Sequence, residues 1–411
     1  MARNIALISM SIAAGLISTI AVGQTSTNLN GTTNTVTTAV PFLRISPDAR
    51  SGAMGDVGIA ISPDANSQYW NLSKLPFAAK PYGVSVTYTP WLKDLVPDIF
   101  LAYISGYAKF GKDENQAVSA SMRYFSLGEI NYTDEQGNSL GTGKPNEFSF
   151  DGGYSRKLSP YLSVGVGFRY IHSAIASGVI TTSSTTAQYK AGNAFGADLG
   201  VYYTKTKEID EFRNHNWSFG AVLSNVGSKI SYTSTRKDFI PINLGLGGAY
   251  TYQADEYNKI TFALDVNKLM VPTPQDTNTV AGDPPNYVIP EKSVVSGMLG
   301  SFGDAPGGFS EELKEFQIST GAEYWYQNQF AVRAGYFYEN KDKGDRQYLT
   351  VGLGVRYNVF NLNFAYLIPS GTGINRNPLS NTLRFSLIFE FDGKKNEEGS
   401  GYSSGSGRSS N

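Results

Sequence analysis

The sequence of 411 residues contains no cysteine and only two histidines, His172 and His215. A chain without cysteine forms no disulfide, no thiolate metal site and no cysteine nucleophile. It also lacks a Walker-type phosphate loop, a calcium loop of the D-x-D-x-D-G kind and the Cys/His spacing of zinc sites. The sequence therefore predicts a protein without a metal or another cofactor.

An excess of charge and a long apolar run are missing as well. The chain carries 34 basic and 35 acidic residues, so its net charge provides no attraction to nucleic acid or to an anionic membrane surface. Beyond residue 23 there is no run of 18 apolar residues, and no membrane-spanning helix is predicted. Abundant instead are glycine (44), tyrosine (26) and phenylalanine (23). No nucleic-acid partner is expected.

The first 23 residues have the pattern of an export signal. Arg3 provides the positive start, an apolar stretch follows over residues 5–22, and small residues precede the expected cleavage site before Gln24. A retained membrane anchor is the alternative, but no basic flank of the stop-transfer kind follows. We expect 1–23 to be removed and 24–40 to form a flexible N-terminal segment.

From Tyr82 onward, apolar and polar residues alternate with the period of two that is typical of a β-strand. In YLTVGLGVRYN, for example, leucine and valine alternate with threonine, glycine and arginine. Most such segments have the roughly ten residues that a tilted strand needs to cross a bilayer. The predicted strands are 82–90, 98–110, 116–126, 146–157, 161–173, 193–204, 215–226, 241–253, 258–268, 316–326, 329–339, 346–358, 360–369 and 382–391.

The connections between these segments alternate between tight turns and longer loops, as expected of a barrel with short periplasmic turns and long external loops. Two connections do not fit: 205–215 is long for a turn, and 340–346 is short for an external loop. The even strand number places both chain termini on the periplasmic side. Residues 81–391 are thus predicted to form an all-β transmembrane outer-membrane β-barrel of about 14 antiparallel strands, followed by a disordered Gly/Ser-rich tail over 392–411.

A secreted soluble β-propeller or β-sandwich is the alternative for a chain of many strands. The apolar face of nearly every predicted strand, however, carries large aliphatic residues with tyrosine or phenylalanine towards its ends. This distribution is typical of a lipid-facing band with aromatic girdles. The barrel is therefore favoured over the soluble folds, with outer-membrane lipid around it.

The polar face of the predicted strands would line the lumen. Pairing of its charges with one another and with a plug is favoured over a solute path, because pairing lowers the cost of partial desolvation. The predicted lumen charges are Arg123, Arg169, Asp198, Asp265, Glu323, Arg333, Arg356, Arg384 and Glu390. Glycines on the same face cannot fill so wide a lumen, which leaves it to another segment or to water. These glycines are Gly165, Gly167, Gly245, Gly247, Gly321, Gly335, Gly352 and Gly354.

The stretch ISPDARSGAMGDVGIAISPDANSQYWN, from residue 45 to residue 71, repeats ISPDA and spaces three glycines three apart. A phosphate-binding loop would need a preceding strand and a following helix with a lysine, and neither is present. We therefore predict that 41–80 forms an N-terminal plug that enters the lumen from the periplasmic side. Ser46 or Ser62 would cap short helices.

The predicted plug residues are Arg50, Gly52, Gly55, Asp56, Gly58 and Asp64. The three glycines would let the backbone pass close to the barrel wall. The three charged residues would pair with the charges of the lumen.

The longest connection, 269–315, is predicted to be a structured external loop. Apolar residues at helical spacing follow residue 293, and a Pro-Gly-Gly turn precedes a second helix with Ser310 as its N-cap and two glutamates in its first turn. A loop of this length with structure of its own is usually functional. The sequence leaves open whether it folds back as a lid or provides a docking surface for a partner.

Catalysis is not expected from this chain. By strand parity His172 lies near the external end on the lipid side, whereas His215 lies at the periplasmic end, about 25 Å away across the apolar band. A Ser–His dyad on His172 would point away from the lumen, and no G-x-S-x-G motif accompanies it. The protein is predicted to be non-enzymatic.

Several long motifs resemble the PorV family of the type IX secretion system of Bacteroidetes, within the wider family of FadL-like barrels. They are PFLRISPDARSGAMGDVGIA, FGDAPGGFSEELKEF, GAEYWYQNQFAVRAGYFYENKDKGDRQYLTVGLGVRYNVF and NPLSNTLRFSLIF. Together they extend over essentially the whole chain after the expected signal. The resemblance implies a fourteen-stranded barrel, in agreement with the strand pattern.

The resemblance also implies a non-enzymatic role in protein secretion. PorV-like proteins receive exported proteins through a C-terminal signal domain as these leave a large translocon barrel, and pass them to an attachment machinery that includes a sortase-like protease. The external loops would then contact the signal domain. From their position in those loops, the expected contact residues are Trp91, Phe302, Asp304, Phe309 and Glu312.

A FadL-type passive transporter of hydrophobic small molecules is the alternative function. Such a transporter needs an apolar pocket that connects the lumen with a lateral gap in the wall. A lumen lined by arginine, aspartate, serine and glycine argues mildly against it.

Overall fold

The structure is a computed structural model of the chain that describes residues 34–91, 98–133, 139–175, 178–181, 186–234, 236–277, 286–368 and 382–392. The expected export signal 1–23, the adjoining residues 24–33 and the tail from residue 393 lie outside the described residues. Among the described helices, none is both long enough and apolar enough to cross a membrane.

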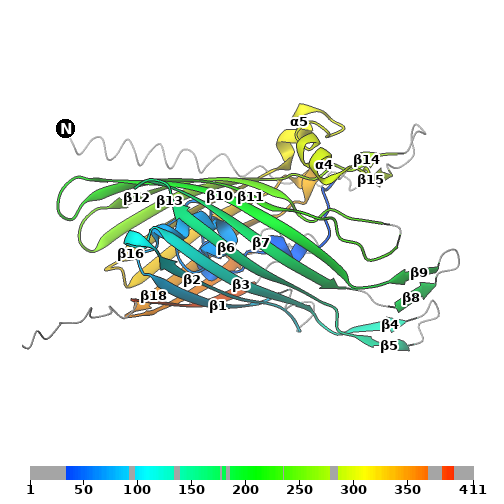
Figure 1. The fold of residues 1–411 in the computed structure, drawn as a ribbon, viewed down its shortest axis with the longest axis horizontal. Coiled ribbons are helices and arrows are strands. Elements are labelled where there is room, and N and C mark those ends of the chain that lie inside the picture. The colour runs from blue at the N-terminus through cyan, green and yellow to red at the C-terminus, as the bar shows by residue number, and fades with distance from the viewer. Residues whose placement is uncertain are drawn as a thin grey trace, which may run out of the picture.

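Fourteen antiparallel strands close into one barrel (Figure 1). Each strand pairs with its neighbours along the chain, and β20 pairs with β1, with Tyr82 opposite Phe391. The strands are β1 Tyr82–Pro90, β2 Ile99–Phe110, β3 Gln116–Leu127, β6 Asn146–Lys157, β7 Leu162–Ala174, β10 Gly192–Glu208, β11 Asn214–Gly227, β12 Asn243–Gln253, β13 Asn258–Leu269, β16 Phe316–Tyr326, β17 Phe330–Tyr338, β18 Gln347–Tyr357, β19 Phe360–Ile368 and β20 Leu383–Phe391. The fourteen predicted strands and the all-β barrel are confirmed.

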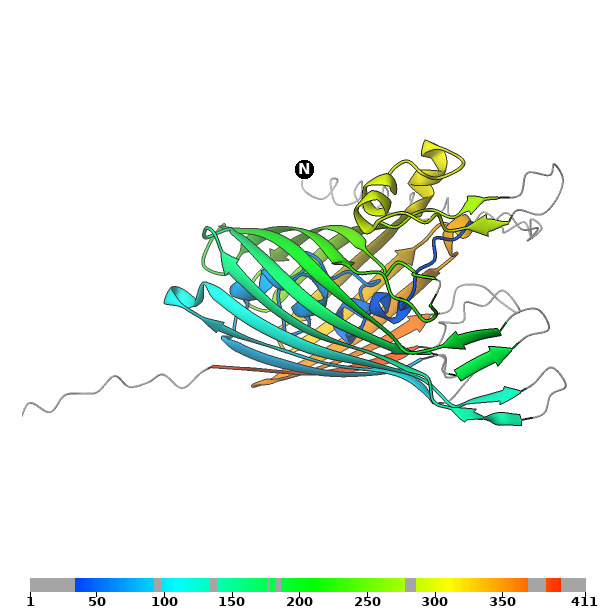
Figure 2. The ribbon, with the colours of Figure 1, turned by 45° about the vertical axis from the view of Figure 1, so that its right-hand side comes forward.

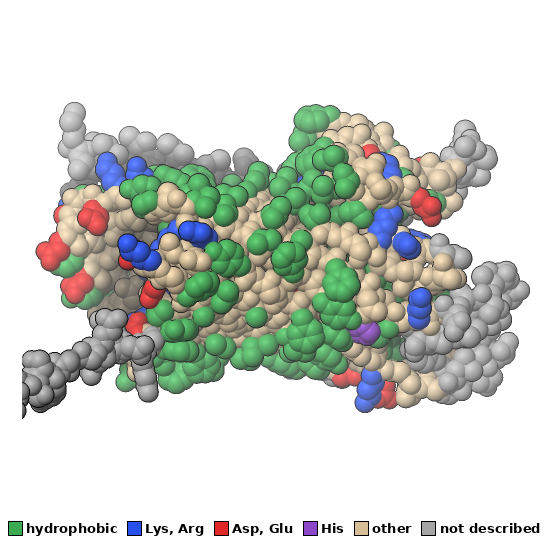
Figure 3. Space-filling model, in the orientation of Figure 1, with side chains coloured by type: hydrophobic (Ala, Val, Ile, Leu, Met, Phe, Trp, Pro, Cys, Tyr) green, Lys and Arg blue, Asp and Glu red, His purple; other side chains and the backbone are tan. Residues whose placement is uncertain are grey.

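The alternation along each strand separates the outer surface of the barrel from its lumen. On β18, Leu349 and Leu353 point outward and remain 53% and 57% exposed, whereas Thr350 between them is buried. Figure 3 shows that such apolar side chains cover the visible face of the barrel wall as a broad band. An outward apolar band of this kind is the surface that a barrel presents to lipid.

The two ends of the barrel differ in the length of their connections. At the short-turn end lie the tight connections after β2, β6, β10, β12, β16 and β18, and the paired residues Tyr82 and Phe391. The long-loop end carries three small hairpins that the sequence did not predict, and Figure 1 shows them at the same end. They pair β4 Ile130–Thr133 with β5 Ser139–Gly143, β8 Gly178–Thr181 with β9 Thr186–Tyr189, and β14 Gln275–Asp276 with β15 Tyr287–Val288.

The two connections that did not fit the alternation have simple explanations. β10 continues to Glu208 and β11 begins at Asn214, so only 209–213 remains as the turn. The short loop between β17 and β18 lies at the long-loop end and contains one 3-10 turn, η5 Lys341–Lys343.

The loop between β13 and β16 contains helical elements after its hairpin. α4 Val294–Gly300 has Ser293 as its N-cap, whose hydroxyl oxygen accepts a hydrogen bond from the Ser296 N–H at 3.2 Å. α5 Phe309–Glu312 continues into η4 Leu313–Glu315. The predicted Ser310 N-cap is wrong, because the helix begins two residues earlier than that cap requires, and its N-cap is Gly308 at a φ of 70°, without a side-chain bond. Figures 1 and 2 show α4 and α5 projecting from the side of the barrel near its long-loop end.

Residues 41–80, here called the luminal segment, lie inside the barrel, and Figure 2 shows their short helices enclosed by the strands. The segment consists of η1 Pro41–Arg44, α2 Ala49–Gly52, α3 Ser67–Trp70 and η2 Leu72–Phe77. Apolar residues of the segment are almost completely buried, among them Phe42, Met54 and Leu75. The segment thus forms the core that the wall glycines leave open.

The luminal segment runs from the long-loop end to the short-turn end. Phe42 packs in an apolar cluster with strand ends such as Leu101 and Leu269, while Leu75 packs with Tyr107 near the short turns. Before it, Asn34 donates a hydrogen bond to the Pro274 carbonyl in the long loop. The sequence analysis expected the segment to enter from the end of the short periplasmic turns. In the structure it starts at the long-loop end and finishes at the short-turn end, so the expected direction is wrong.

Candidate functional site

The start of α2 is held by Asp48 and not by a serine. One carboxylate oxygen of Asp48 accepts a hydrogen bond from the Ser51 N–H at 2.8 Å, and the other accepts one from Trp70 Nε1 at 2.7 Å. The predicted caps Ser46 and Ser62 are wrong. Asp48 directly precedes the helix, where a carboxylate both reaches the free N–H groups and links α2 to α3.

The second ISPDA repeat is not followed directly by a helix. Asp64 accepts a hydrogen bond from the Asn66 N–H at 2.8 Å, which makes a local turn, and α3 begins only at Ser67. The Ser62 hydroxyl accepts a hydrogen bond from Arg50 Nη2 at 2.7 Å. Two identical pentapeptides thus have different structures, because their surroundings differ.

A buried charge cluster joins the luminal segment to the wall. Arg50 donates to Glu323 on β16 through Nε at 2.9 Å and Nη2 at 2.8 Å, and Arg333 on β17 donates to the same carboxylate at 2.6 Å. Asp64 completes the cluster from within the segment, at 3.0 Å from Arg50 Nη1. Opposite charges at this spacing compensate one another in an interior that water does not reach.

Two further carboxylates connect the luminal segment to the wall. Asp56 accepts hydrogen bonds from Arg384 Nη1 at 2.8 Å and from the Tyr348 hydroxyl at 2.6 Å. Asp265 on β13 accepts the backbone N–H groups of Gly58 and Ile59 at 2.7 and 2.9 Å. Asp56, Asp265 and Arg384, all predicted from the sequence, thus take part in contacts between the luminal segment and the wall.

The remaining predicted lumen charges have other surroundings. Arg169 pairs with Asp198 at 3.0 Å and with Asp151, a residue that the sequence analysis missed although strand register places it opposite Arg169. Arg123 donates to the Leu43 carbonyl at 3.0 Å and lies over the Tyr69 ring. Arg356 and Glu390 are 3.8 Å apart near the short-turn end, and neither makes an ion pair with a described residue of the luminal segment.

The glycines permit a close approach between segment and wall. A Cβ atom added at Gly55, where φ is 71°, would lie 2.6 Å from the backbone N and O of Tyr336 on β17. From the other side, a Cβ at Gly335 would collide with the backbone of Met54 and Gly55. A Cβ at Gly52 would meet the side chain of Arg384.

The third plug glycine and the other lumen glycines complete this arrangement. Gly58 makes room for Trp70 of the luminal segment itself and not for the wall. Of the eight lumen-face glycines, only Gly354 faces wall side chains alone in its nearest contacts; for the others the added Cβ would approach the luminal segment. The wall glycines on the lumen face therefore line the space that the luminal segment occupies.

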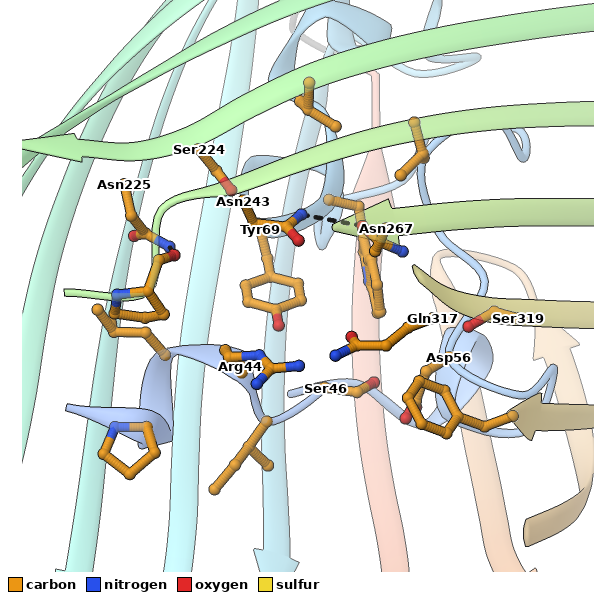
Figure 4. Close-up of a pocket in the computed structure, with 18 of the residues that line it drawn as sticks. Arg44, Ser46, Asp56, Tyr69, Ser224, Asn225, Asn243, Asn267, Gln317 and Ser319 are labelled. Carbon is orange, nitrogen blue, oxygen red and sulfur yellow. Dashed lines mark hydrogen bonds between the residues drawn. The ribbon is translucent and has the colours of Figure 1, made fainter. Parts of the chain in front are cut away.

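Above the luminal segment, on its long-loop side, lies a cavity of about 140 Å³. We call this cavity the chamber (Figure 4). Its wall includes four arginines, Arg44, Arg169, Arg346 and Arg384, and one carboxylate, Asp56. Amide and hydroxyl groups from β11, β12, β13 and β16 line another part of it, and apolar residues such as Leu43, Ile59 and Trp91 line the rest.

The long loop is fixed to the outside of the wall by ion pairs. Lys268 near the end of β13 is only 1% exposed, because Glu312 and Glu315 cover its ammonium group at 3.1 and 2.6 Å. Lys343 in the loop after β17 contacts Glu315 at 3.0 Å and also pairs with Glu311. Neither lysine was predicted from the sequence. The signal was present for Lys268, because a lysine on the outward face of a barrel strand indicates that another element covers it.

The five expected contact residues fall into two groups. Phe302 and Phe309 on the long loop are 47% and 76% exposed. Asp304 and Glu312 are used within the loop: Asp304 pairs with Lys292 at 3.2 Å, and Glu312 accepts the Ala305 N–H at 2.7 Å. Trp91 is buried in the apolar cluster at the long-loop end and lines the chamber. Only the two phenylalanines are placed where a partner can reach them.

The pH dependence of the loop follows from Glu311. Burial raises the pKa of this carboxyl. The Lys343 ammonium, the Gly307 N–H and Asn34 together lower it by more, so the pKa of Glu311 is below its usual value. Its contacts therefore stabilise the loop above the unfolded pKa of about 4.3 and are lost as the pH falls through the lower folded pKa. Amide exchange of 305–315, corrected for intrinsic pH effects, is expected to accelerate in that acidic range.

The variant Glu311→Gln is the control for this prediction, since it keeps the shape of the side chain and removes the titration. Its exchange should be faster than that of the unchanged protein near neutral pH, and the difference should vanish at acidic pH, where Glu311 is protonated. Equal protection of the unchanged protein at pH 3 and pH 6 would contradict the prediction.

Among the described residues, no group of three or more His, Cys, Asp or Glu side chains is arranged to hold a metal ion. His172 lies near the long-loop end with Nδ1 2.8 Å from Asn193 Oδ1, and His215 is the second residue of β11 at the short-turn end. The two histidines are therefore not brought together.

Comparisons with known proteins place the chain in context. The family model described as "Type IX secretion system protein PorV" matches residues 28–276, more than half of the chain. No curated protein matches the sequence. Similar solved structures include the Ralstonia pickettii toluene transporter TbuX (TM-score 0.47, 10% identity, 84% of this chain and 98% of that chain covered) and the P. putida toluene transporter TodX (0.46, 11%, 84% and 99%). A Pseudomonas aeruginosa FadL homologue is also similar (0.40, 9%, 84% and 99%).

Proposed function

The chain belongs to the PorV family of type IX secretion system proteins, and from this premise we propose that it binds exported cargo proteins at the cell surface. In this proposal the long-loop end is extracellular and the short-turn end periplasmic, as in outer-membrane barrels. The cargo is recognised through its C-terminal signal domain as it leaves a large translocon barrel. It is then delivered to an attachment machinery with a sortase-like protein. The role is one of binding and transfer, without catalysis.

The observation that carries this proposal is an exposed apolar surface on a firmly held external loop. Five apolar side chains of the α4–α5 region are 47–76% exposed: Val295, Leu299, Phe302, Phe309 and Leu313. The ion pairs of Lys268 and Lys343 beneath them hold the loop in place, so a partner would not have to order it on binding. Several exposed apolar side chains on one short stretch of chain are typical of a protein-binding site.

Replacing Phe309 and Leu299 together with serine is expected to weaken cargo capture on the order of 30-fold, because exposed aromatic anchors dominate interface energies. The measurement is pull-down or titration of purified protein in detergent with a cargo C-terminal domain. Both positions are exposed, so the barrel should fold normally.

Phe212→Ser is the matched control, since Phe212 is 47% exposed in the turn 209–213 at the opposite end of the barrel. It should leave capture unchanged. Unimpaired capture by the Phe309/Leu299 variant would remove the α4–α5 region from the cargo site.

We also propose that the luminal segment acts as a plug, so that the barrel itself conducts neither cargo nor solute. The charge pairs of Arg50 and Asp56 and the glycine contacts support this role. A passive route for hydrophobic small molecules, the alternative function, would need an apolar passage, whereas four arginines and Asp56 stand among the apolar residues of the chamber wall. Uptake of a hydrophobic compound that depends on this barrel in whole cells would restore the alternative.

A further inference from the structure

One arginine of the chamber wall, Arg44, has an ion pair but no hydrogen bond among the described residues. Arg44 makes no hydrogen bond to any described residue, and its guanidinium lies 3.9 Å from the nearest carboxylate, that of Glu339. Its side chain is 21% exposed, and it lines the chamber. An arginine usually donates several hydrogen bonds from its planar guanidinium, so this one is open to a further acceptor.

Glu339 has little capacity left for Arg44. Its two oxygens accept hydrogen bonds from Arg346 Nε at 2.7 Å and Arg346 Nη2 at 2.9 Å, and a third comes from the Gln317 amide at 2.8 Å. Such a two-point pairing already satisfies the carboxylate. Two guanidinium groups thus share one negative charge at this side of the chamber.

The other arginines of the chamber wall are neutralised by their own partners. Arg384 pairs with Asp56, and Arg169 pairs with Asp151 and Asp198. Each of these carboxylates is engaged with at least one arginine, so none of them is spare for Arg44. Among the arginines of the chamber wall, Arg44 is therefore the one without a hydrogen-bonded carboxylate among the described residues; its ion pair with Glu339, at 3.9 Å, is too long for a hydrogen bond.

A second, independent observation also indicates a missing acceptor. The Ser46 hydroxyl is 3% exposed and has no hydrogen-bond partner among the described residues, and the same holds for Arg384 Nε. Both residues line the chamber. Figure 4 shows Arg44 and the amide of Gln317 reaching toward each other, with Tyr69 and Ser46 beside them. The Ser46 hydroxyl, Arg384 Nε and the Arg44 guanidinium are thus donors at the chamber wall without a hydrogen-bond acceptor among the described residues.

We infer that the chamber binds a small oxyanion of the phosphate class, held by the Arg44 guanidinium and the Ser46 hydroxyl. A volume of about 140 Å³ is enough for a few water molecules at about 30 Å³ each, or for one tetrahedral oxyanion. Water would satisfy the hydroxyl but would bring no negative charge to Arg44, which shares the Glu339 carboxylate with Arg346. An oxyanion supplies both the negative charge and the acceptor atoms.

The test is a titration of the purified full chain in detergent with inorganic phosphate against chloride at constant ionic strength. Calorimetry is expected to show saturable binding of one phosphate. Arg44→Gln should weaken that binding about tenfold or more, the loss expected for a charge-assisted hydrogen bond. Ser46→Ala should weaken it less.

Arg213→Gln is the matched control, because it removes the same charge from an exposed turn at the far end of the barrel. It should bind phosphate as the unchanged protein does. Absence of saturable binding to the unchanged protein, or equal binding by Arg44→Gln, would show that the chamber holds water only and would overturn the inference. If Arg44→Gln does not fold, equal binding by Ser46→Ala and the unchanged protein would overturn the role of the hydroxyl.

Discussion

Replacing Glu323 with glutamine is expected to destabilise the folded barrel by about 3–5 kcal/mol, the usual cost of breaking a buried ion pair by removing one partner. Glu323 is 2% exposed and accepts three hydrogen bonds from Arg50 and Arg333, which are themselves buried. Without its charge, both guanidinium groups would lose the carboxylate on which they converge. The effect should be large because no water can replace the lost charge.

Urea unfolding in detergent micelles, followed by tryptophan fluorescence, measures this change. Glu390→Gln is the control: its partner Arg356 is 3.8 Å away and 39% exposed, so the expected loss is under about 1 kcal/mol. Similar unfolding midpoints for the two variants would contradict the assignment of Glu323 as the central anion of the cluster.

The barrel could be predicted from the sequence because a strand that faces lipid on one side and the lumen on the other must alternate. That requirement leaves a period of two in each strand, as in β18, without reference to any other part of the chain. The wall glycines were also informative, since they indicated that their own strands do not fill the lumen and left it to another segment or to water. These features are local, and the sequence records them directly.

The direction of the luminal segment and its contacts were not predictable in the same way. Entry from the long-loop end depends on Asn34 and Phe42 meeting residues hundreds of positions later, which no local pattern records. The capping errors have the same origin. Both ISPDA repeats look alike, but only Asp48 has Trp70 as a partner, whereas Asp64 is drawn into the Arg50 cluster.

Position in an external loop does not by itself predict which side chains are exposed to a partner. Phe309 and Glu312 are three residues apart, yet one is exposed and the other is buried against Lys268. Which residues of a loop face outward depends on what the loop is attached to. An outward lysine on β13 was the feature that could have indicated this attachment.

Replacing Gly335 with valine is expected to displace the luminal segment and to open the barrel to small solutes. A Cβ at this position would overlap the backbone of Met54 and Gly55, and backbone atoms cannot move aside as a flexible side chain can. Overpacking of this kind costs about 1–3 kcal/mol where the structure can adjust. Since the wall strand is fixed by its two neighbours, the adjustment should fall on the luminal segment.

Conductance in planar bilayers and sensitivity of whole cells to a large antibiotic measure the opening. Gly152→Val is the matched control, because a Cβ at Gly152 would meet no described atom within 4 Å. It makes the same change in another barrel strand and should leave the barrel closed. A folded Gly335→Val barrel that conducts no more than the control would mean that the segment stays in place, or that something other than residues 41–80 closes the lumen. An increase confined to Gly335→Val would show that close packing of the segment against the wall keeps the lumen shut.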